Sequence, residues 1–435
     1  MTTTPAILGA WGVIPTAGEK RNLMKVNVAL TDHAYAVDTD FEEGGAMLSA
    51  SSASGPAFHG PVHVDDLTLV DGDILYTVCR VKIVTWAQAT ADPLPLLVFE
   101  ENRSQGLTGG YTKALTISVQ DNDTSLHARM GDLVNPTLDT GAAMTYVLGT
   151  AYTLMVSVER VSSTSATIKL WKWDGTNWNL QGSAATGTLD WSAFGSFKSI
   201  YVGTSMTVAK GDVGTIKFSR VITAINMIPA GSMMCDHEAL VTTPDGSTYD
   251  EWVDAAAGAT VNDDVDDVLG SESSADYMTS TSTTAQKTQE LNVVDVSGIT
   301  DTIRGIVVTA GVTTTPATCN GTAYMATRLS GTDSAFKDAY YGDANWDATG
   351  AAEDKDTSRF FEKDPSGSTL TQANINSATI LFRKVATGAA ETWAIHSLVL
   401  QVLHGDIWTP PTAVESPVAF AGSGVTHLGL GIGII

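Results

Sequence analysis

Residues 151–222 contain four short runs that alternate apolar and polar side chains: AYTLMVSVERV (151–161), SATIKLWKW (165–173), KSIYV (198–202) and GTIKFSRVI (214–222). Each run is rich in β-branched and aromatic residues, and polar or glycine-bearing stretches separate the runs. This pattern is typical of antiparallel strands that bury one face. Similar runs occur on both sides, such as DILYTVCRVKIVTW (73–86) and TWAIHSLVLQV (392–402). The sequence therefore predicts an all-β fold of packed antiparallel sheets.

The composition limits the possible partners. Hydrophobic residues make up 43% of the 435 residues, enough for a core, while charged residues make up only 17%, below the usual ~25%. The net charge is −24, with 15 basic and 21 acidic residues over 1–234 and 9 basic and 26 acidic residues over 235–408. We expect no binding to nucleic acid or to anionic membranes. The acidic second half indicates either a self-repelling outer surface or simply high solubility.

Cysteine usage and the N-terminus indicate folding in a cytoplasm. The three cysteines, Cys79, Cys235 and Cys319, are far apart and form no CxxC pair, so neither a disulfide framework nor a zinc ribbon is expected. The start MTTTPA lacks the basic and apolar regions of a signal peptide. No apolar run reaches the ~18 residues that a membrane span needs. We expect no cofactor.

The segment 226–232 is the predicted domain boundary. Pro229 and Gly231 end a strand there, and the charge balance changes just beyond them. The prediction is an N-terminal lead-in segment over 1–23, a β-sandwich over 24–228, an acidic β-sandwich over 235–405 and a C-terminal arm over 406–435.

The first predicted sandwich resembles a known family. The order of its strands, with LWKWDG at 170–175, IYVG at 200–203 and GTIKFSRV at 214–221, is similar to the closing half of concanavalin A-like, laminin-G-type domains. The resemblance covers about residues 24–225. It implies a jelly roll of two packed antiparallel sheets, a fold whose members often bind calcium or glycans at one rim.

The second predicted sandwich contains Asp276-Tyr277, Asp364-Pro365-Ser366-Gly367 and Leu370-Thr-Gln-Ala-Asn-Ile-Asn376. In this order the three motifs resemble a domain of structural proteins from tailed phages, with Leu370 in place of the usual Trp. The resemblance covers about 240–405. Together the two halves imply two tandem antiparallel β-sandwich (jelly-roll) domains with an extended C-terminal arm, in a structural protein of a phage particle.

The C-terminal arm ends in an unusual alternation, VTHLGLGIGII (425–435). Leu428, Leu430, Ile432 and Ile434 fall on one face of an extended strand, and glycines occupy the other. A lone strand of this kind is unstable in water and has an adhesive edge. We expect it to pair with another subunit, although a strand within its own domain is the alternative.

Three tryptophans near a predicted hairpin have two interpretations. Trp171 and Trp173 share one face of a strand, Asp174-Gly175 supplies the turn, and Trp178 lies on the returning strand. Packing across the hairpin is the ordinary role of such a set. The alternative is a platform on which a sugar ring stacks, which makes these three residues the candidate glycan-binding site.

Acidic and histidine-bearing stretches give only weak metal candidates. Asp263, Asp264, Asp266 and Asp267 are dense enough for a calcium loop, but the stretch lacks the glycine and closing glutamate of an EF-hand. His59 and His63 with Asp65 and Asp66 are a second weak set, because Gly60-Pro61 prevents a helical face. A solvated loop or turn is the expected role of both stretches, so we predict no metal site.

No catalytic motif is visible in the sequence. The Glu-x-Asp-x-x-Glu strand of sandwich glycosidases, Gly-x-Ser-x-Gly, the Walker loop and His-Glu-x-x-His are all absent. The sequence therefore predicts a protein that is not an enzyme.

We expect a virion protein, made in a bacterial cytoplasm, that serves as a capsid decoration, head spike or tail accessory protein. It forms a homo-oligomer, a trimer or larger, and contacts other virion proteins such as the major capsid or tail proteins. The alternative is a receptor-recognition module that binds a host surface glycan.

Overall fold

The computed structural model describes residues 2–12, 33–42, 45–51, 57–87, 94–100, 114–119, 124–131, 135–194, 197–204, 213–244, 249, 251–254, 278–280, 285–315, 323–329, 331–338, 353–354, 357–385 and 392–411. Almost all of the described elements are strands, and every strand pair is antiparallel. This confirms the predicted all-β fold.

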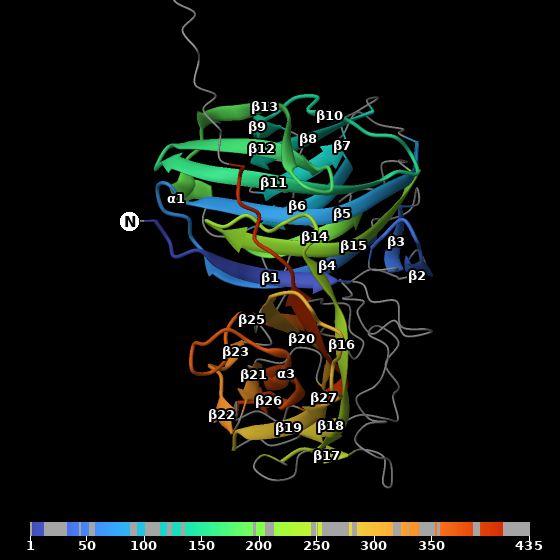
Figure 1. Cartoon of the computed structure of the whole chain (residues 1–435), viewed down its shortest axis with the longest axis vertical. Helices are drawn as coiled ribbons and strands as arrows, with labels where there is room; N and C mark the ends of the chain where they lie inside the picture. The colour runs from blue at the N-terminus through green and yellow to red at the C-terminus, as the bar shows by residue number, and fades with distance from the viewer. Residues whose placement is uncertain are drawn as a thin grey trace, which may run out of the picture.

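Two sheets form the first unit, which is the upper one in Figure 1. The eight-stranded sheet has the order β13 (Trp178–Thr188), β12 (Ser165–Trp173), β11 (Ala151–Ser162), β5 (Ile74–Ala87), β15 (Val213–Ile225), β3 (Gly45–Ser51) and β2 (His33–Val37), with β1 (Ala6–Gly12) also on β15. The seven-stranded sheet has the order β10 (Met144–Thr145), β8 (Ser125–Gly131), β7 (Ala114–Val119), β6 (Leu94–Glu100), β14 (Phe197–Thr204) and β4 (Ala57–Leu67), with β9 (Pro136–Asp139) also on β8. The short helix α1 (Trp191–Phe194) precedes β14.

Alternation along the strands makes this unit a sandwich. Leu154, Val156 and Val158 of β11 are completely buried in the core between the two sheets, as are Leu115 and Ile117 of β7. Successive side chains of a strand point to opposite faces, so each of these strands also presents a second face outside the core. The two outer faces differ in chemistry, as described below.

The N-terminal residues belong to this unit. The stretch predicted as a lead-in contains β1, which pairs with β15 along Ala6–Gly12. Asp73 fixes the preceding residues, because its carboxylate accepts hydrogen bonds from the Thr3 backbone N–H (2.7 Å) and the Asn226 side chain (2.9 Å). Burial would raise the pKa of Asp73, but these bonds and others from Thr3 and Val70 outweigh it and lower that pKa. Asp73 therefore ties the N-terminus to the segment that follows β15.

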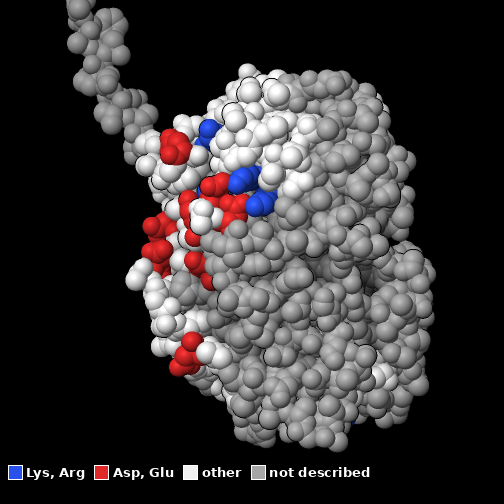
Figure 2. All heavy atoms as spheres, turned by 90° about the vertical axis from the view of Figure 1, so that its right-hand side faces the viewer, with Lys and Arg blue, Asp and Glu red and all other residues white. Residues whose placement is uncertain are grey.

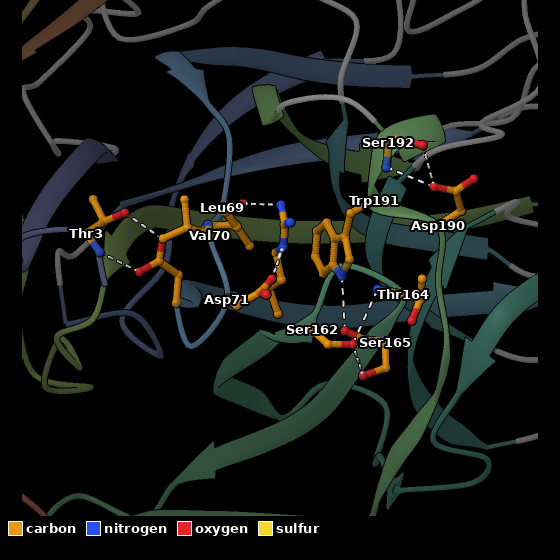
Figure 3. A network of polar contacts seen from close by, with 12 residues as sticks. Thr3, Leu69, Val70, Asp71, Ser162, Thr164, Ser165, Asp190, Trp191 and Ser192 are labelled. Atoms are coloured by element: carbon orange, nitrogen blue, oxygen red, sulfur yellow. Dashed lines mark hydrogen bonds and ion pairs between the residues drawn. The ribbon is translucent and has the colours of Figure 1, made fainter. Parts of the chain in front are cut away.

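Figure 3 shows the part of this network around Thr3 and Val70, together with a second network around Asp71 and Trp191. Arg160 donates to the Asp71 carboxylate (2.8 Å) and lies over the ring of Trp191, 5.7 Å from its centroid. The indole N–H of Trp191 in turn donates to the Ser165 carbonyl at 3.0 Å. These contacts join α1, the β11–β12 hairpin and the β4–β5 turn, so we assign them to the stability of the sandwich.

The second unit is a further set of antiparallel strands, the lower one in Figure 1. Its main path is β17 (Val253–Asp254), β18 (Met278–Ser280), β27 (Thr392–His404), β16 (Met234–Pro244), β19 (Lys287–Val293), β26 (Ala378–Lys384), β21 (Ala323–Leu329) and β22 (Thr332–Asp333). β20 (Ile303–Thr315) pairs with β27, β24 (Glu353–Asp354) and β25 (Thr357–Phe361), while β23 (Lys337–Asp338) pairs with β21. The helix α3 (Gln372–Asn376) precedes β26.

One strand joins the two halves of this second unit. The first part of β16 pairs with β27 and its last part with β19, so the strand passes from one sheet to the other. A core that includes Trp252, Phe382 and Trp393 fills the space between them. Leu370, the residue that departs from the phage pattern, is 3% exposed and belongs to this core. The unit thus has its own apolar centre.

A third apolar cluster lies where the two units meet, and we call it the junction. Its buried members are Ile7, Ala10, Tyr76, Val78, Met155, Trp178, Ile222, Ala224, Met233, Cys235, Val307, Phe360 and Leu403. Backbones approach closely here, since a Cβ on Gly12 would lie 2.0 Å from the Cys235 carbonyl oxygen. Gln401 donates to the Gly12 carbonyl at 2.9 Å. The two units are therefore packed against each other rather than joined only by a linker. The predicted domain boundaries remain a proposal.

Candidate functional site

The outer face of the seven-stranded sheet carries polar side chains on β7 and β8. Every second residue of these strands faces the apolar core: Leu115, Ile117, Val119, Leu126, Ala128 and Met130. The residues between them face away from it, and Asp139 at the end of β9 lies opposite Arg129 in the ladder. We name this set the His127 cluster; its members are Thr116, Ser118, Ser125, His127, Arg129 and Asp139.

His127 is held on both ring nitrogens. Its Nδ1 lies 2.8 Å from Oδ1 of Asp139, and its Nε2 lies 3.1 Å from Oγ of Ser125. A carboxylate only accepts hydrogen bonds, so we assign the proton to Nδ1. Nε2 of the neutral ring is then an acceptor, and the Ser125 hydroxyl donates to it.

Asp139 is ionised and held by several donors. Its Oδ2 lies 2.8 Å from Nε of Arg129, and its Oδ1 accepts a 2.7 Å hydrogen bond from the Gly141 N–H. Burial raises the pKa of Asp139, but the hydrogen bonds from His127 and Gly141 and the charge of Arg129 outweigh it and lower that pKa. The carboxylate therefore stays negative beside His127 at neutral pH.

Two hydroxyls of the cluster are buried and have no hydrogen-bond partner among the described residues. Thr116 lies opposite Arg129 in the β7–β8 ladder, and Ser118 lies opposite His127. Their side chains are 1% and 0% exposed, and neither hydroxyl makes a hydrogen bond in the described structure. A buried polar group left unsatisfied costs about 1–3 kcal/mol, so such groups often mark a place where a ligand or ion completes the bonding.

The cluster combines three kinds of chemistry on one face. Ser125 and His127 form a hydrogen-bonded hydroxyl and imidazole pair, Arg129 supplies a cation, and Thr116 and Ser118 supply hydroxyls that both donate and accept. Asp139, whose side chain is 27% exposed, is its most exposed member. This set suits the recognition of polar, hydroxyl-bearing molecules and the transfer of a proton.

Sequence reasoning missed this site. The run SLHARM (125–130) alternates as a short strand does, but the pattern alone gives no role to its polar positions. The signal was the regular spacing of Ser125, His127 and Arg129 on the face opposite the core. The partner Asp139 was not visible, since it comes from another strand and only the β8–β9 pairing brings it to His127.

The three tryptophans of the predicted glycan platform lie on the other sheet, at the junction. Trp178 is 4% exposed and donates its indole N–H to the Pro229 carbonyl at 2.8 Å. Its ring packs against Trp173 at 5.2 Å between centroids, and a Cβ on Gly231 would lie 2.2 Å from Cγ of Trp173. Trp171 donates to Ser157 Oγ at 3.0 Å. Trp171 and Trp173 are half-buried. Of the three tryptophans in the predicted platform, these two keep some exposed surface.

The other candidate residues of the sequence cannot be placed. Asp263, Asp264, Asp266 and Asp267 lie outside the described residues, and so do Leu428, Leu430, Ile432 and Ile434 of the predicted arm. His59, His63, Asp65 and Asp66 belong to β4, but their side chains are outside the description as well. Within the described part of the chain, no three His, Cys, Asp or Glu side chains come together as a group that could hold a metal ion.

The charges around Asp38, on the outer face of the eight-stranded sheet, are paired. Asp38 accepts from Lys217 at 2.6 Å and from Lys82 at 3.3 Å, and Lys82 also pairs with Asp40. Burial raises the pKa of Asp38, but the bonds from Lys217, the Asp40 N–H and Lys82 outweigh it and lower that pKa. Figure 2 shows one face of the molecule on which described basic side chains adjoin acidic ones.

No described helix is long and apolar enough to cross a bilayer.

Comparisons with known proteins give likenesses in fold. No protein-family model matches the chain, and no curated protein matches its sequence. Solved structures that resemble it include an endo-β-1,4-glucuronan lyase from the fungus Trichoderma reesei (13% identity, 51% of this chain and 95% of that chain, TM-score 0.31). Others are the alginate lyase Aly36B (13%, 50% and 97%, TM-score 0.28) and peanut lectin with a nine-residue peptide (9%, 51% and 98%, TM-score 0.31).

The prediction that the chain is not an enzyme is wrong as an exclusion. Polysaccharide lyases are among the structures that the chain resembles. The prediction depended on the absence of contiguous catalytic motifs. Strand pairing nevertheless brings a serine, a histidine and an aspartate together on β8 and β9, and no motif of that kind can be read along one segment.

Proposed function

We propose that the chain is a glycan-binding β-sandwich protein and that the ligand contacts the His127 cluster. The observation that carries this proposal is the pair of buried, unpartnered hydroxyls of Thr116 and Ser118 on the same face as His127 and Arg129. Sugar hydroxyls donate and accept hydrogen bonds, and so do these two side chains. A bound sugar would complete their bonding, while Arg129 supplies a donor to a sugar oxygen or carboxylate.

The test compares glycan binding by matched threonine variants. Thr116→Val keeps the shape of the side chain and removes its hydroxyl, so the fold should remain intact. The control is Thr167→Val on the eight-stranded sheet, which removes a hydroxyl bonded only to Thr186, at 2.9 Å. On a glycan array followed by titration calorimetry, we expect wild type and the control to bind alike and Thr116→Val to bind at least about 5-fold more weakly, the value of about one hydrogen bond.

Trp173→Ala separates this site from the tryptophan platform. If the platform binds the glycan, this variant loses binding and Thr116→Val keeps it. If no glycan binds to the wild type, the proposed function fails. The intact chain is used throughout because the junction buries parts of both units.

A second candidate is a structural component of a phage particle, such as a capsid decoration, head spike or tail accessory protein. It would act as a homo-oligomer, a trimer or larger, bound to other virion proteins. The observation that favours it is the buried junction, which joins two sandwiches into a stiff body. The chain leaves this junction through residues 406–411, where Trp408 donates its N–H to the Ile228 carbonyl at 2.8 Å. An arm that begins there is well placed to join subunits.

Removal of residues 412–435 tests this second candidate. The truncation spares Trp408 and the junction. Light scattering on the purified protein should show a smaller oligomer than the full chain forms, and the truncated protein should no longer join particles. An unchanged oligomer and unchanged incorporation would contradict the role of the arm.

A further inference from the structure

We propose that Ser125, His127 and Asp139 form an acyl-transfer site that hydrolyses ester substituents, such as O-acetyl groups, on a carbohydrate held at the same face. The carbohydrate part of this inference rests on the proposed glycan binding, whereas the acyl-transfer part stands on the geometry of the three side chains.

The three groups are in the order that nucleophilic catalysis requires. Ser125 Oγ lies 3.1 Å from Nε2 of His127, and Nδ1 of His127 lies 2.8 Å from Oδ1 of Asp139. The carboxylate keeps the Nδ1 proton in place, so Nε2 can take a proton from the serine. A serine, a base and a group that orients the base are the parts by which such sites are recognised, whatever their positions in the sequence.

A second histidine shows that this arrangement is not the general state of histidines in the protein. His404 lies 2.6 Å from a carboxylate oxygen of Asp236 through Nε2 and 3.3 Å from one of Asp301 through Nδ1. Burial lowers the pKa of His404, but the bonds and charges of Asp236 and Asp301 outweigh it and raise that pKa above its ordinary value. His404 thus has a carboxylate at each ring nitrogen, whereas His127 has one carboxylate and one hydroxyl.

The reaction proceeds in two balanced halves. Ser125 Oγ attacks the ester carbonyl carbon, and its proton moves to Nε2 of His127. The carbon–oxygen bond to the sugar then breaks, and His127 returns that proton to the sugar oxygen, which leaves an acylated Ser125. Water next loses a proton to His127 and attacks the acyl carbon, so that the carboxylic acid departs and Ser125 regains its proton. The net reaction consumes one ester and one water and yields a sugar hydroxyl and an acid.

Charge that develops on the carbonyl oxygen needs donors nearby. Ser118 lies opposite His127 in the ladder, and directly opposed residues have Cβ atoms about 4.5–5.5 Å apart. Its buried hydroxyl has no other partner in the described structure. Arg129, held by Asp139, contributes a cation on the same face. We assign the stabilisation of the oxyanion to these two groups.

A small serine-reactive probe tests the site without any need for glycan binding. The intact chain is treated with a fluorophosphonate, and modified peptides are mapped by mass spectrometry. We expect an adduct at Ser125 in the wild type and none in His127→Asn. Ser192 is the internal control, because its hydroxyl is exposed and bonded to the Asp190 carboxylate at 2.6 Å rather than to a histidine. Labelling of Ser125 no faster than that of Ser192 overturns the proposal.

Turnover of p-nitrophenyl acetate gives the second readout. Ser125→Ala should lower the rate at least about 100-fold, while Ser192→Ala should leave it unchanged. Asp139 is a positioning residue here. In a well-studied catalytic triad, the Asp→Asn change lowers kcat about 10⁴-fold because the imidazole is then held in the wrong tautomer. We therefore expect Asp139→Asn to slow the acylation of Ser125. Circular dichroism checks that this variant is still folded. An unchanged rate in Ser125→Ala overturns the proposal.

Acetylated xylan then tests the substrate class. Release of acetate by the wild type and not by Ser125→Ala supports the full inference. Labelling of Ser125 with no acetate release and no glycan binding overturns the carbohydrate part and the proposed function together. Glycan binding with no labelling of Ser125 overturns only the acyl-transfer site.

Discussion

The two outer faces of the first sandwich have opposite uses. On the eight-stranded sheet, Trp178, Met155 and Ile222 pack into the junction and are almost completely buried. On the seven-stranded sheet, the corresponding positions carry His127, Arg129 and Asp139, which bond to one another. Both faces arise from the same alternation along strands. The large aromatic residues of one outer face thus pack within the chain, and the candidate site that we propose lies on the other, polar face.

The largest expected effect concerns the apolar face. Trp178→Ala removes a buried aromatic side chain from the junction and should lower the free energy of unfolding by about 3–5 kcal/mol. Trp178→Phe keeps an aromatic ring and loses the bond to the Pro229 carbonyl, so it should cost less, by the value of about one hydrogen bond plus a small cavity. Urea denaturation followed by tryptophan fluorescence and circular dichroism measures both. A cost for Trp178→Ala no larger than for Trp171→Ala, a half-buried residue, would contradict the junction.

The second effect concerns the polar face. Asp139→Asn removes the charge that holds His127 and Arg129, and we expect a loss of about 2 kcal/mol at pH 7, the value of a hydrogen bond to a charged group. The pKa of Asp139 is lowered in the folded chain, so its carboxylate stabilises the fold above its unfolded pKa of about 3.9. This contribution is lost as the pH falls through the folded pKa.

Urea denaturation at several pH values measures this dependence. The difference between wild type and Asp139→Asn should be constant from about pH 7 to pH 5 and should shrink below about pH 4. Asp174→Asn is the control, since the pKa of Asp174 is also lowered, by bonds from the Asn177 N–H and the Asn179 side chain, but Asp174 is exposed at a turn. Equal behaviour of the two variants would show that the His127 cluster has no special stability.

Sequence alone predicted the all-β fold, because alternation is a local property. It named several of the long strands, including 73–86, 151–161 and 392–402. It did not predict that Ala6–Gly12 forms a strand, since its pairing partner on β15 is about 215 residues away. It also could not assign the tryptophans to the junction, because the contacts of Trp173 and Trp178 with residues 229–231 depend on how the segment after β15 folds back.

A smaller effect concerns the histidine at the junction end of β27. The pKa of His404 is raised in the folded chain, so its charge stabilises the fold fully below the unfolded pKa of about 6.5. That contribution is lost as the pH rises through the folded pKa. His404→Gln should therefore be less stable than wild type at pH 5.5 and should approach it above about pH 8. A stability difference that grows with pH would contradict the ion pairs with Asp236 and Asp301.

The candidate site was beyond sequence reasoning for a similar physical cause. The hydrogen bond between His127 and Asp139 joins residues of two strands whose register contains an irregularity between Met130 and Gly131. That irregularity brings Asp139 opposite Arg129. Alternation predicts which residues of β8 leave the core, but it says nothing of which carboxylate they meet.

The smallest expected effect on stability is that of Thr116→Val on the polar face. It tests directly whether the Thr116 hydroxyl is free to bond to a ligand. Thr116→Val deletes a buried hydroxyl that has no hydrogen-bond partner in the described part of the chain, and the replacement of such a group by an apolar one of the same shape is nearly neutral or stabilising. We expect the free energy of unfolding to stay within about 0.5 kcal/mol of wild type or to rise by up to about 1 kcal/mol. Thr167→Val is the matched change at a bonded, exposed hydroxyl. A loss of more than about 1 kcal/mol in Thr116→Val would mean that its hydroxyl is bonded in solution, and the argument that a ligand completes it would fail.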